Sequence, residues 1–563
     1  MPDAVSAPRP KTVLTDHTAD HTADHTADVG GSTGNRSGSS AEHTDASAQS
    51  GQQPAIPLQP ATETLTGWGR TSPVSATIVV PRSAAQVESI LAVARATSED
   101  TSQTTSGDTS EDIASTPDRA HRWPGEEAPE QVPTLKGFTA STKRGVIARG
   151  LGRSYGDAAQ RAGGLVTDMT SMDALRSWDP ATGEVTVDAG MSLDTLMRLF
   201  IPRGWFVPVT PGTRFVTVGG AIAADVHGKN HHHDGSFGMH VKRLSVVTSN
   251  GIDELSAGNE AERDRFWATV AGMGLTGIVL DATLRLMAVE TAFMRVETSR
   301  MNDLDDTMAC LEAGDNKFRY SVAWLDCLAR GSRLGRSVIT LGDHATKADL
   351  PTDSVENPLS FSPVARLGLP FAPPSGALSS PSVRLFNSAW FHRAPRRSRT
   401  SIEPLASFFH PLDGVRRWNL LYGPLGFLQY QVVVPFGAEG TLRGILEGLA
   451  SSRCPSFLAV LKRFGPASPA PLSFPMPGWT LALDIPRGPR DLHQLLNRFD
   501  DLVASAGGRV YLAKDSRLQP HHLAEMYPKL AQWRETRSIM DPGGVVHSDL
   551  ASRLHLTDPV RQP

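Results

Sequence analysis

Two glycine-rich stretches in one predicted domain limit the fold of this chain more than any other feature. The first, residues 149–159, reads Arg-Gly-Leu-Gly-Arg-Ser-Tyr-Gly-Asp-Ala-Ala, and the second spans residues 211–230. Glycine has no Cβ and tolerates positive φ, so such loops let backbone amides approach an anion closely. Thr217 can cap a helix that begins at Val218, which would turn a helix N-terminus toward the same anion. The pair predicts the two halves of a cradle for a cofactor that carries a pyrophosphate.

The spacing of the first loop excludes two common nucleotide sites. Gly150, Gly152 and Gly156 follow a Gly-x-Gly-x-x-x-Gly pattern, which is not the dinucleotide fingerprint of a Rossmann fold. A Walker-type site needs a Gly-Lys-Ser/Thr sequence, and the loop lacks one. We therefore expect neither a Rossmann domain nor ATP chemistry.

Composition narrows the class of protein further. The 563 residues, 39% of them apolar, are enough for two to four domains with real cores. A net charge of −4 gives no reason to expect nucleic-acid binding. Three widely spaced cysteines indicate neither a disulfide framework nor a CxxC metal site. The sequence has no apolar run long enough to span a membrane and no secretory signal pattern, so we expect at most peripheral membrane association.

The pattern along the chain predicts four segments. Residues 1–62 are polar, contain a His-Thr-Ala-Asp repeat at residues 17–28, and are expected to be disordered. A cofactor domain is expected over residues 63–290, with a low-complexity insertion at 97–142. A second domain is expected over 291–507. Residues 508–563 are expected to return to the first domain.

Local signals place several elements in the cofactor domain. Ser83, with Gln86 three residues later, and Ser192 are candidate caps of two amphipathic helices. Strands are expected at residues 145–149, 164–168, 184–189, 244–248 and 278–286. This mixture predicts an α+β fold.

A histidine cluster follows the second loop. His227 and His231 have the HxxxH spacing of a zinc site, and His232, His233 and Asp234 adjoin them. That spacing converges only on a helix, and Gly228 and Asn230 disfavour one there. We therefore expect no metal, and a polar loop in which His227 lies nearest the cofactor.

At this point the chain resembles a known family. Both loops, residues 266–279 and the C-terminal strand resemble the vanillyl-alcohol-oxidase class of flavoproteins. Residues 236–238, 422–431, 471–479 and 514–517 are similar to those of a group within it, the polyprenylphosphoryl-ribose 2'-oxidases. The resemblance covers residues 65–554 outside the insertion. It implies a PCMH-type FAD-binding domain and an α+β substrate domain built on an antiparallel sheet.

The resemblance also implies a reaction and partners. FAD would oxidise the 2'-hydroxyl of a lipid-linked ribose to a ketone, and a short-chain reductase would complete the epimerisation to an arabinose donor for cell-wall arabinan. A lipid substrate favours a membrane quinone over oxygen as the final electron acceptor. Oxidation of a soluble alditol or aldonolactone is the alternative with the same fold. A metal-binding scaffold built on the histidines is the non-enzymatic alternative.

Two positions depart from the relatives. Many members of the class carry, in the first loop, a histidine that bonds covalently to the flavin, and this chain has Arg153 there. A guanidinium cannot form that bond, so we expect non-covalent FAD. Ala482 stands where the nearest group has a cysteine, which removes a thiol from the substrate side.

The candidate catalytic residues are Lys514, at the reacting sugar, and His227, as a rival general base, with Tyr155 beside them. Strand alternation sends Gln429 and Gln431 to one face, where they and Lys462 would contact substrate. The cofactor-binding set comprises Arg149, Gly150, Leu151, Gly152, Arg153, Ser154, Tyr155, Gly156, Asp157, Ala158, Ala159, Gly212, Thr217, Val218, Gly219, Gly220, Ala224, Asp225, Val226, His227, Ile278, Val279 and Tyr511.

Overall fold

The computed structural model describes residues 58–103 and 139–558, apart from residues 366, 370, 375–377, 453, 455, 457 and 489–490. The His-Thr-Ala-Asp repeat and most of the predicted insertion lie outside these residues. Helix α1 (Ala84–Gln103) nevertheless continues beyond residue 97, where we had expected the insertion to begin. Strand β1 likewise begins at Ala61, inside the segment expected to be disordered.

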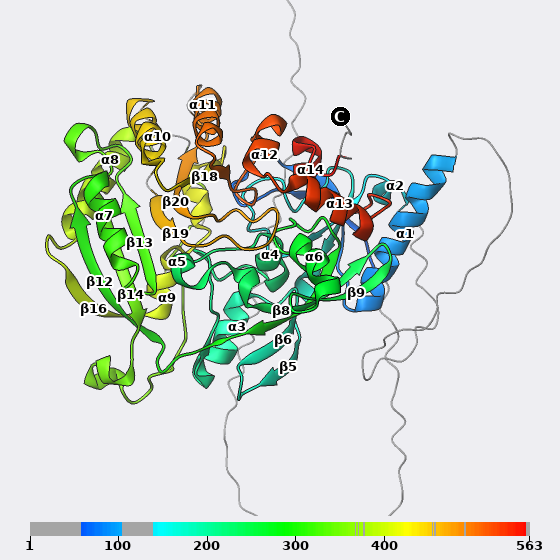
Figure 1. Ribbon diagram of the computed structural model, residues 1–563, viewed down its shortest axis with the longest axis horizontal. Coiled ribbons are helices and arrows are strands. Elements are labelled where there is room, and N and C mark those ends of the chain that lie inside the picture. The colour runs from blue at the N-terminus through cyan, green and yellow to red at the C-terminus, as the bar shows by residue number, and fades with distance from the viewer. Residues whose placement is uncertain are drawn as a thin grey trace, which may run out of the picture. The chain divides into compact units, whose positions relative to one another are not determined.

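Two sheets build the first region of the described chain (Figure 1). The four-stranded sheet has the order β1 (Ala61–Leu65), β2 (Val74–Val79), β4 (Leu165–Asp168), β3 (Val146–Arg149). The five-stranded antiparallel sheet has the order β5 (Leu175–Asp179), β6 (Glu184–Asp188), β10 (Ile278–Arg285), β8 (Val241–Thr248), β9 (Gly251–Ser256). A short pair joins β7 (Trp205–Phe206) to β11 (Met287–Ala288). The remaining helices of this region are α2 (Thr139–Thr142), α3 (Leu193–Phe200), α4 (Val218–Ala223), α5 (His231–Asp234) and α6 (Glu260–Thr269).

The predicted helix caps are present. The Ser83 hydroxyl accepts from the Gln86 amide at 3.3 Å, and the Gln86 side chain accepts from the Arg82 amide at 2.7 Å. Ser192 accepts from the Thr195 amide at 3.0 Å at the start of α3. These caps satisfy amides that the first helical turn leaves without an intrahelical partner.

An eight-stranded antiparallel sheet dominates the second region. Its order is β16 (Arg399–Pro404), β12 (Phe293–Met301), β14 (Ser337–His344), β13 (Tyr320–Leu325), β19 (Ala459–Phe464), β20 (Gly478–Pro486), β18 (Phe427–Pro435), β21 (Arg509–Val510). Helices α7 (Leu304–Gly314), α10 (Glu439–Ser452) and α11 (Leu492–Ser505) pack on it (Figure 1). In α10 the buried residues Leu442, Ile445, Leu446 and Leu449 recur at helical spacing and form one apolar stripe.

The register of this sheet places polar side chains together. Gln431 pairs with Ala482 and Gln429 with Asp484 across β18 and β20, while Ala482 pairs with Val460 across β20 and β19. Because side chains alternate along a strand, these residues and Lys462 share one face of the sheet. The fold thereby gives one sheet face two amides, a carboxyl and an amine.

The C-terminal segment packs against the first region. After β21, helices α12 (Pro520–Met526), α13 (Leu530–Met540) and α14 (Asp549–Leu554) follow, and α13 contacts α6. The Trp533 indole donates to the Ala268 carbonyl at 2.9 Å, and Val546 bridges Val146 of β3. No helix within the described residues is both long and apolar enough to cross a membrane.

Candidate active site

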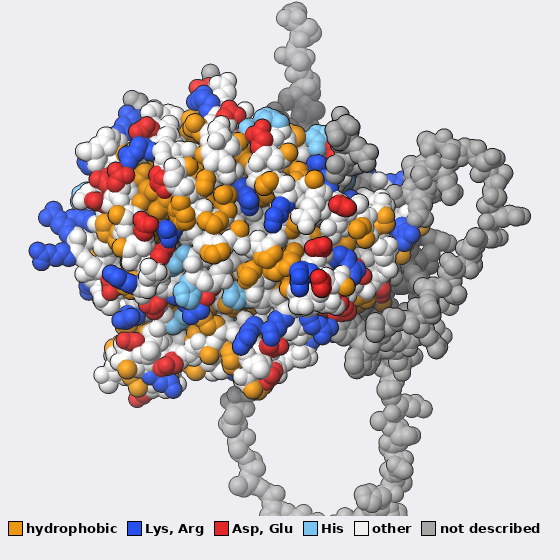
Figure 2. Space-filling model, in the orientation of Figure 1, with side chains coloured by type: hydrophobic (Ala, Val, Ile, Leu, Met, Phe, Trp, Pro, Cys, Tyr) orange, Lys and Arg blue, Asp and Glu red, His pale blue; other side chains and the backbone are white. Residues whose placement is uncertain are grey.

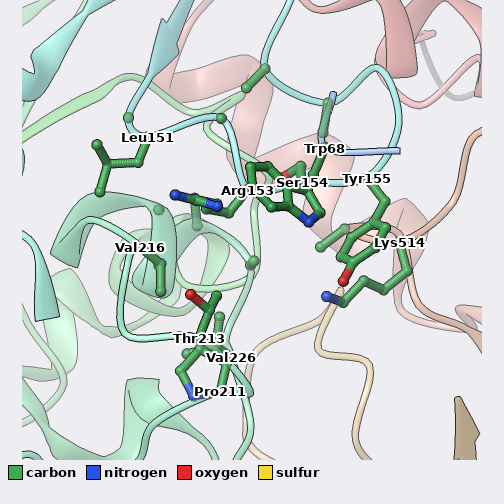
Figure 3. Close-up of a pocket in the computed structure, with 18 of the residues that line it drawn as sticks. Trp68, Leu151, Arg153, Ser154, Tyr155, Pro211, Thr213, Val216, Val226 and Lys514 are labelled. Carbon is green, nitrogen blue, oxygen red and sulfur yellow. The ribbon is translucent and has the colours of Figure 1, made fainter. Parts of the chain in front are cut away.

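A large cavity runs from the first glycine-rich loop to the polar face of the eight-stranded sheet. Figure 3 shows its wall around Arg153, Tyr155 and Lys514. From the predicted cofactor set it is lined by Arg149, Gly150, Leu151, Gly152, Arg153, Ser154, Tyr155, Ala158, Ala159, Gly212, Thr217, Gly219, Gly220, Ala224, Val226, His227, Val279 and Tyr511. The predicted substrate residues Gln429, Gln431, Lys462 and Lys514 all line it as well. Two loops and one sheet face, far apart in sequence, thus meet at one cavity.

The first loop offers unused amides to this cavity. The N–H groups of Gly150, Leu151, Gly152 and Ser154 donate to no acceptor within the described residues. Gly152 has a φ of +62°, which favours glycine and bends the loop so that successive amides form a concave donor surface. Such a surface suits a phosphate.

Arg149 fixes this loop in place. Its guanidinium donates to the Ala159 carbonyl at 2.9 Å and to the Thr66 carbonyl at 2.9 Å. Burial lowers its pKa, and Asp168 opposes that effect. Arg149 therefore ties the loop to its surroundings, although it also lines the cavity.

The second loop departs from the expectation that its helix N-terminus faces an anion. Thr217 does cap α4, accepting from the Gly220 amide at 3.1 Å. The first amides of α4 are nevertheless already used, because Val218 donates to the Met191 carbonyl at 2.9 Å and Gly219 to the Ala189 carbonyl at 2.8 Å. A Cβ on Gly219 would lie 3.0 Å from the Ala189 Cβ, so this glycine serves helix packing. The amides of Val218 and Gly219 are therefore not available to an anion, whereas those of the first loop are.

Five residues of the predicted cofactor set do not line the cavity: Gly156, Asp157, Val218, Asp225 and Ile278. Asp157 instead binds Arg553 of α14 through two hydrogen bonds of 2.8 Å. A Cβ on Gly156 would lie 2.0 Å from the Asp515 carbonyl oxygen. Gly156 and Asp157 thus hold the C-terminal segment against the loop.

Asp225 joins the second loop to residues 468–473, which lie between β19 and β20 in sequence. Its buried carboxylate accepts from the hydroxyls of Ser236 at 2.8 Å, Ser468 at 3.0 Å and Ser473 at 2.6 Å, and from the Gly238 amide at 2.9 Å. Burial raises its pKa, and these four donors oppose the shift. The carboxylate thereby fastens residues 468–473 to the second loop.

Arg153 lies in the cavity wall on an aromatic platform. Its guanidinium carbon is 3.9 Å from the Trp68 ring centroid and 5.6 Å from that of Phe215. Stacking of this kind holds a guanidinium in a fixed orientation in the cavity wall.

His227 is held from both sides at the far end of the cavity. Its Nε2 lies 2.9 Å from the Gln431 Nε2, and its Nδ1 lies 3.1 Å from the Lys462 Nζ. Burial lowers its pKa well below the usual value, and the charges of Lys462, His231 and Lys514 add to that effect. A neutral imidazole whose two nitrogens are both engaged is a poor general base.

Lys514 has a different environment. Its Nζ lies 4.0 Å from the Tyr155 ring centroid and donates no hydrogen bond within the described part of the chain. Burial lowers its pKa to about 8, and Asp484 opposes that shift. Figure 3 shows this amine beside the Tyr155 phenol, with the cavity before it. The amine can therefore donate or accept a hydrogen bond in the cavity.

Lys462 and Asp484 also titrate near neutrality. Burial lowers the pKa of Lys462 to about 7, and the charges of Lys229 and Lys514 contribute. Burial raises the pKa of Asp484 to about 7, against donation by Gln429, the charge of Lys514 and donation by Tyr422. Perturbed groups that face one cavity are typical of catalytic sites.

A small apolar cluster closes the cavity around Tyr155. Tyr155, Trp418, Tyr422 and Phe427 form its buried centre, and Leu412 packs against it. Burial raises the pKa of Tyr155 well above its usual value, so its phenol stays protonated. Tyr155 is therefore a donor and an apolar wall.

Sequence reasoning missed other lining residues: Trp68, Pro211, Thr213, Val216, Leu412, Trp418, Leu458, Val460 and Asp484. Asp484 is the most important of them chemically. Only the pairing of β18 with β20 reveals that it accepts from Gln429 and from the Tyr422 hydroxyl. The sequence signal for Asp484 was its proximity to Ala482, which the resemblance placed on the substrate side.

Comparison with known families identifies the cofactor. Residues 127–253 match the family described as FAD binding domain, a stretch that contains both glycine-rich loops. Residues 485–554 match D-arabinono-1,4-lactone oxidase, a stretch that contains Lys514. The open amides of the first loop fit the pyrophosphate of FAD, and FAD is the cofactor of this chain.

Curated relatives cover most of the described chain. The chain is 44% identical, over 73% of its length and 90% of the relative's, to decaprenylphosphoryl-β-D-ribose oxidase of Mycolicibacterium smegmatis. It is 40% identical over 65% of its length to all of an uncharacterised protein of the mprA 5' region of Streptomyces coelicolor. Over 31% of its length it is 29% identical to cytokinin dehydrogenase 4 of Oryza sativa, across 34% of that enzyme.

Proposed function

The chain belongs to the decaprenylphosphoryl-β-D-ribose oxidase family, and on that premise we propose that it uses FAD to oxidise the 2'-hydroxyl of a polyprenylphosphoryl-β-D-ribose to a ketone. The observation that carries the proposal is the single sheet face on which Gln429, Gln431, Lys462 and Asp484 face Lys514 across one cavity. Side-chain amides and amines that line one cavity suit sugar hydroxyls and a phosphodiester.

In this proposal residues 291–507 supply the substrate-binding domain. The amides of Gly150, Leu151, Gly152 and Ser154 would hold the pyrophosphate of FAD, and the guanidinium of Arg153 would contact the cofactor beside them. When bound, FAD supplies the acceptor for the hydride that leaves C2'. The chain itself has to orient the sugar and take the hydroxyl proton.

We assign the proton acceptor to Lys514. A pKa of about 8 leaves a neutral fraction of this amine at neutral pH, and its Nζ faces the cavity without a protein hydrogen-bond partner in the described chain. The neighbouring carboxyl of Asp484 favours the protonated amine that results from the transfer. His227 then positions Gln431 and Lys462, because both of its ring nitrogens are already engaged.

A route for the lipid tail supports a polyprenyl substrate over a soluble sugar. Leu412 and Trp418 line the cavity, and between them β17 (Val415–Arg416) pairs with β15 (Leu367–Gly368). Around β15 the side chains of Val364, Leu367 and Phe371 are exposed. An exposed apolar surface of this kind suits a prenyl chain.

We propose peripheral membrane association from the surface of helix α8. Helix α8 (Ser380–Arg393) buries Val383, Asn387 and Phe391 and exposes Leu385, Phe386 and Trp390. Exposed arginines adjoin this apolar face at positions 384, 393, 396 and 397. Figure 2 shows basic side chains projecting from the end of the molecule that carries α8 in Figure 1. Apolar and basic groups together are typical of helices that lie in a membrane interface.

We further propose a short-chain reductase as the partner that consumes the ketone, which completes a donor for cell-wall arabinan. A membrane quinone is the proposed acceptor that reoxidises the flavin, because the substrate itself resides in lipid.

We propose that FAD is bound without a covalent link. Arg153 stands where a covalent histidine would be needed, and its guanidinium rests on Trp68. Acid precipitation of the purified protein is therefore expected to release all flavin into the supernatant. Flavin that stays with the pellet would contradict this arrangement.

Analysis of the product tests the proposed reaction. Polyprenylphosphoryl-ribose incubated with the holoenzyme and an artificial electron acceptor should lose two hydrogens, and borodeuteride should then place deuterium at C2'. Deuterium at another carbon, or an unchanged lipid, would refute the assignment of the 2'-hydroxyl.

A further inference from the structure

A second group of metal-ligating side chains lies outside the cavity, where α11 meets α12. Asp501 belongs to the C-terminal part of α11, and His521 and His522 belong to the first turn of α12. One ligand atom from each of the three lies within 4.8 Å of the others. We propose that Asp501, His521 and His522 bind a zinc ion.

The geometry of the three side chains suits a tetrahedral ion. The His522 Nε2 lies 3.0 Å from the Asp501 Oδ1, close to the ligand-to-ligand edge of about 3.3 Å in a zinc tetrahedron. The two imidazole rings lie 4.0 Å apart between centroids, and one nitrogen of each lies within 4.8 Å of the other and of a carboxylate oxygen of Asp501. Two imidazoles and a carboxylate form a donor set that zinc accepts, with a water as the fourth ligand.

Burial gives the site a fixed side and an open side. His522 is buried, while Asp501 and His521 are exposed, so an ion can enter from solvent. The His522 Nδ1 has no hydrogen-bond partner among the described residues, and neither does the Oδ1 of the neighbouring, buried Asp500. The other carboxylate oxygen of Asp500 accepts from the Arg517 guanidinium.

The position of the site gives the ion a structural consequence. Residues 506–519 connect α11 to α12, and this connection carries β21 and Lys514. An ion held by Asp501 at one end and by the two histidines at the other closes this connection into a loop. Metal binding thereby restrains the segment that carries the amine of the active site.

The test compares zinc binding by full-length holoenzyme variants in one background. His17, His21 and His25 of the N-terminal repeat are first replaced by alanine, because they can bind zinc themselves. In that background Asp501→Ala and His521→Ala each change an exposed side chain and should not affect folding. His493→Ala in α11 and Glu525→Ala in α12, both exposed, are the matched controls.

We expect one equivalent of Zn²⁺ to bind and to raise Tm in the background protein and in both controls. Asp501→Ala and His521→Ala should weaken this binding at least about tenfold and abolish the Tm shift. Co²⁺ should give the visible absorption of a four-coordinate ion only where the site is intact. Equal Zn²⁺ affinity and stoichiometry in the two site variants and the controls would overturn the proposal, as would six-coordinate Co²⁺. These readouts do not depend on sugar oxidation.

Discussion

At the scale of single residues, the site keeps two lysines in surroundings that disfavour their charge. Lys514 and Lys462 face the same cavity and are both buried enough to lower their pKa, to about 8 and about 7. Their difference lies in their contacts. Lys462 is held by His227 and by the Gly228 carbonyl at 3.3 Å, whereas Lys514 rests on the Tyr155 ring and donates no hydrogen bond among the described residues. On this difference we base the proposal that Lys462 positions and Lys514 reacts.

Replacement of Lys514 tests the reacting role. Lys514→Ala should slow reduction of the flavin by substrate about 10²–10⁴-fold, because a positioned proton acceptor contributes that much. Flavin content should not change, because the amine meets the first loop at the Tyr155 ring and supplies none of its backbone donors. Stopped-flow absorbance under anaerobic conditions measures the rate, and the exposed Lys529→Ala is the control. An unchanged rate in Lys514→Ala would remove this residue from the reaction.

The pH dependence of the same rate follows from the pKa of Lys514. Only the neutral amine can take a proton, so the reduction rate should rise with pH and level off above about 8. A rate that falls over this range would indicate that the ammonium is the active form.

Lys462 should make stability depend on pH. Its pKa is about 7 in the folded protein and 10.5 for the free side chain, so the folded state binds fewer protons between these values. The resulting destabilisation is complete below pH 7 and is relieved as pH rises toward 10.5. Lys462→Met removes this destabilisation. The free energy of unfolding should therefore rise by on the order of 1–3 kcal/mol at pH 6, and this gain should shrink by pH 9. Urea unfolding of both proteins at the two pH values measures this difference, and a constant or growing gain would contradict it.

At the scale of elements, the helix caps could be predicted from the sequence, because a cap depends on residues that lie close together in the chain. The caps at Ser83, Ser192 and Thr217 were predictable because each cap bonds an amide three residues away. The hydrogen bonds of the first α4 amides could not be predicted in this way, since their acceptors, the carbonyls of Met191 and Ala189, precede α3. Asp484 was missed for the same reason, because only the pairing of β18 with β20 brings it to Gln429. Local sequence carries no information about strand register between distant segments.

The link from Asp225 to residues 468–473 gives a prediction at this scale. Asp225→Ala leaves three hydroxyls and one amide without their acceptor. The loss should lower stability by about 2–4 kcal/mol and weaken FAD retention, because the link lies beside α4. Thermal unfolding and flavin fluorescence measure both effects, and Asp264→Ala on the exposed face of α6 is the control. Equal Tm and FAD retention in Asp225→Ala and the control would show that the link is dispensable.

At the scale of the whole molecule, one cavity joins a dinucleotide loop to a polar sheet face, and the proposed path of the lipid tail leads from it to the exposed apolar side chains around β15. The resemblance of the two loops and of residues 422–431, 471–479 and 514–517 predicted the fold class and the cofactor, which the family comparisons support. It could not predict the route between cavity and surface, because β15 and β17 consist of two residues each and have no sequence signature.

The apolar face of α8 predicts binding to membranes. Leu385→Ser with Trp390→Ser should weaken binding to anionic lipid vesicles by about tenfold or more, since each buried apolar side chain contributes about 1.5–3 kcal/mol. Cosedimentation with vesicles measures the partition. Ile539→Ser, a matched change of a side chain that is 62% exposed on α13, should have no effect. Equal losses in both variants would indicate nonspecific adsorption.

The central claim is that this cavity oxidises a lipid-linked ribose with FAD. Anaerobic titration of the holoenzyme with polyprenylphosphoryl-β-D-ribose, an alditol and an aldonolactone, followed by flavin absorbance, tests it most directly. We predict that the ribose lipid bleaches the flavin band stoichiometrically and that the two soluble compounds leave it unchanged. Bleaching by the alditol or the aldonolactone, with no response to the ribose lipid, would contradict the account.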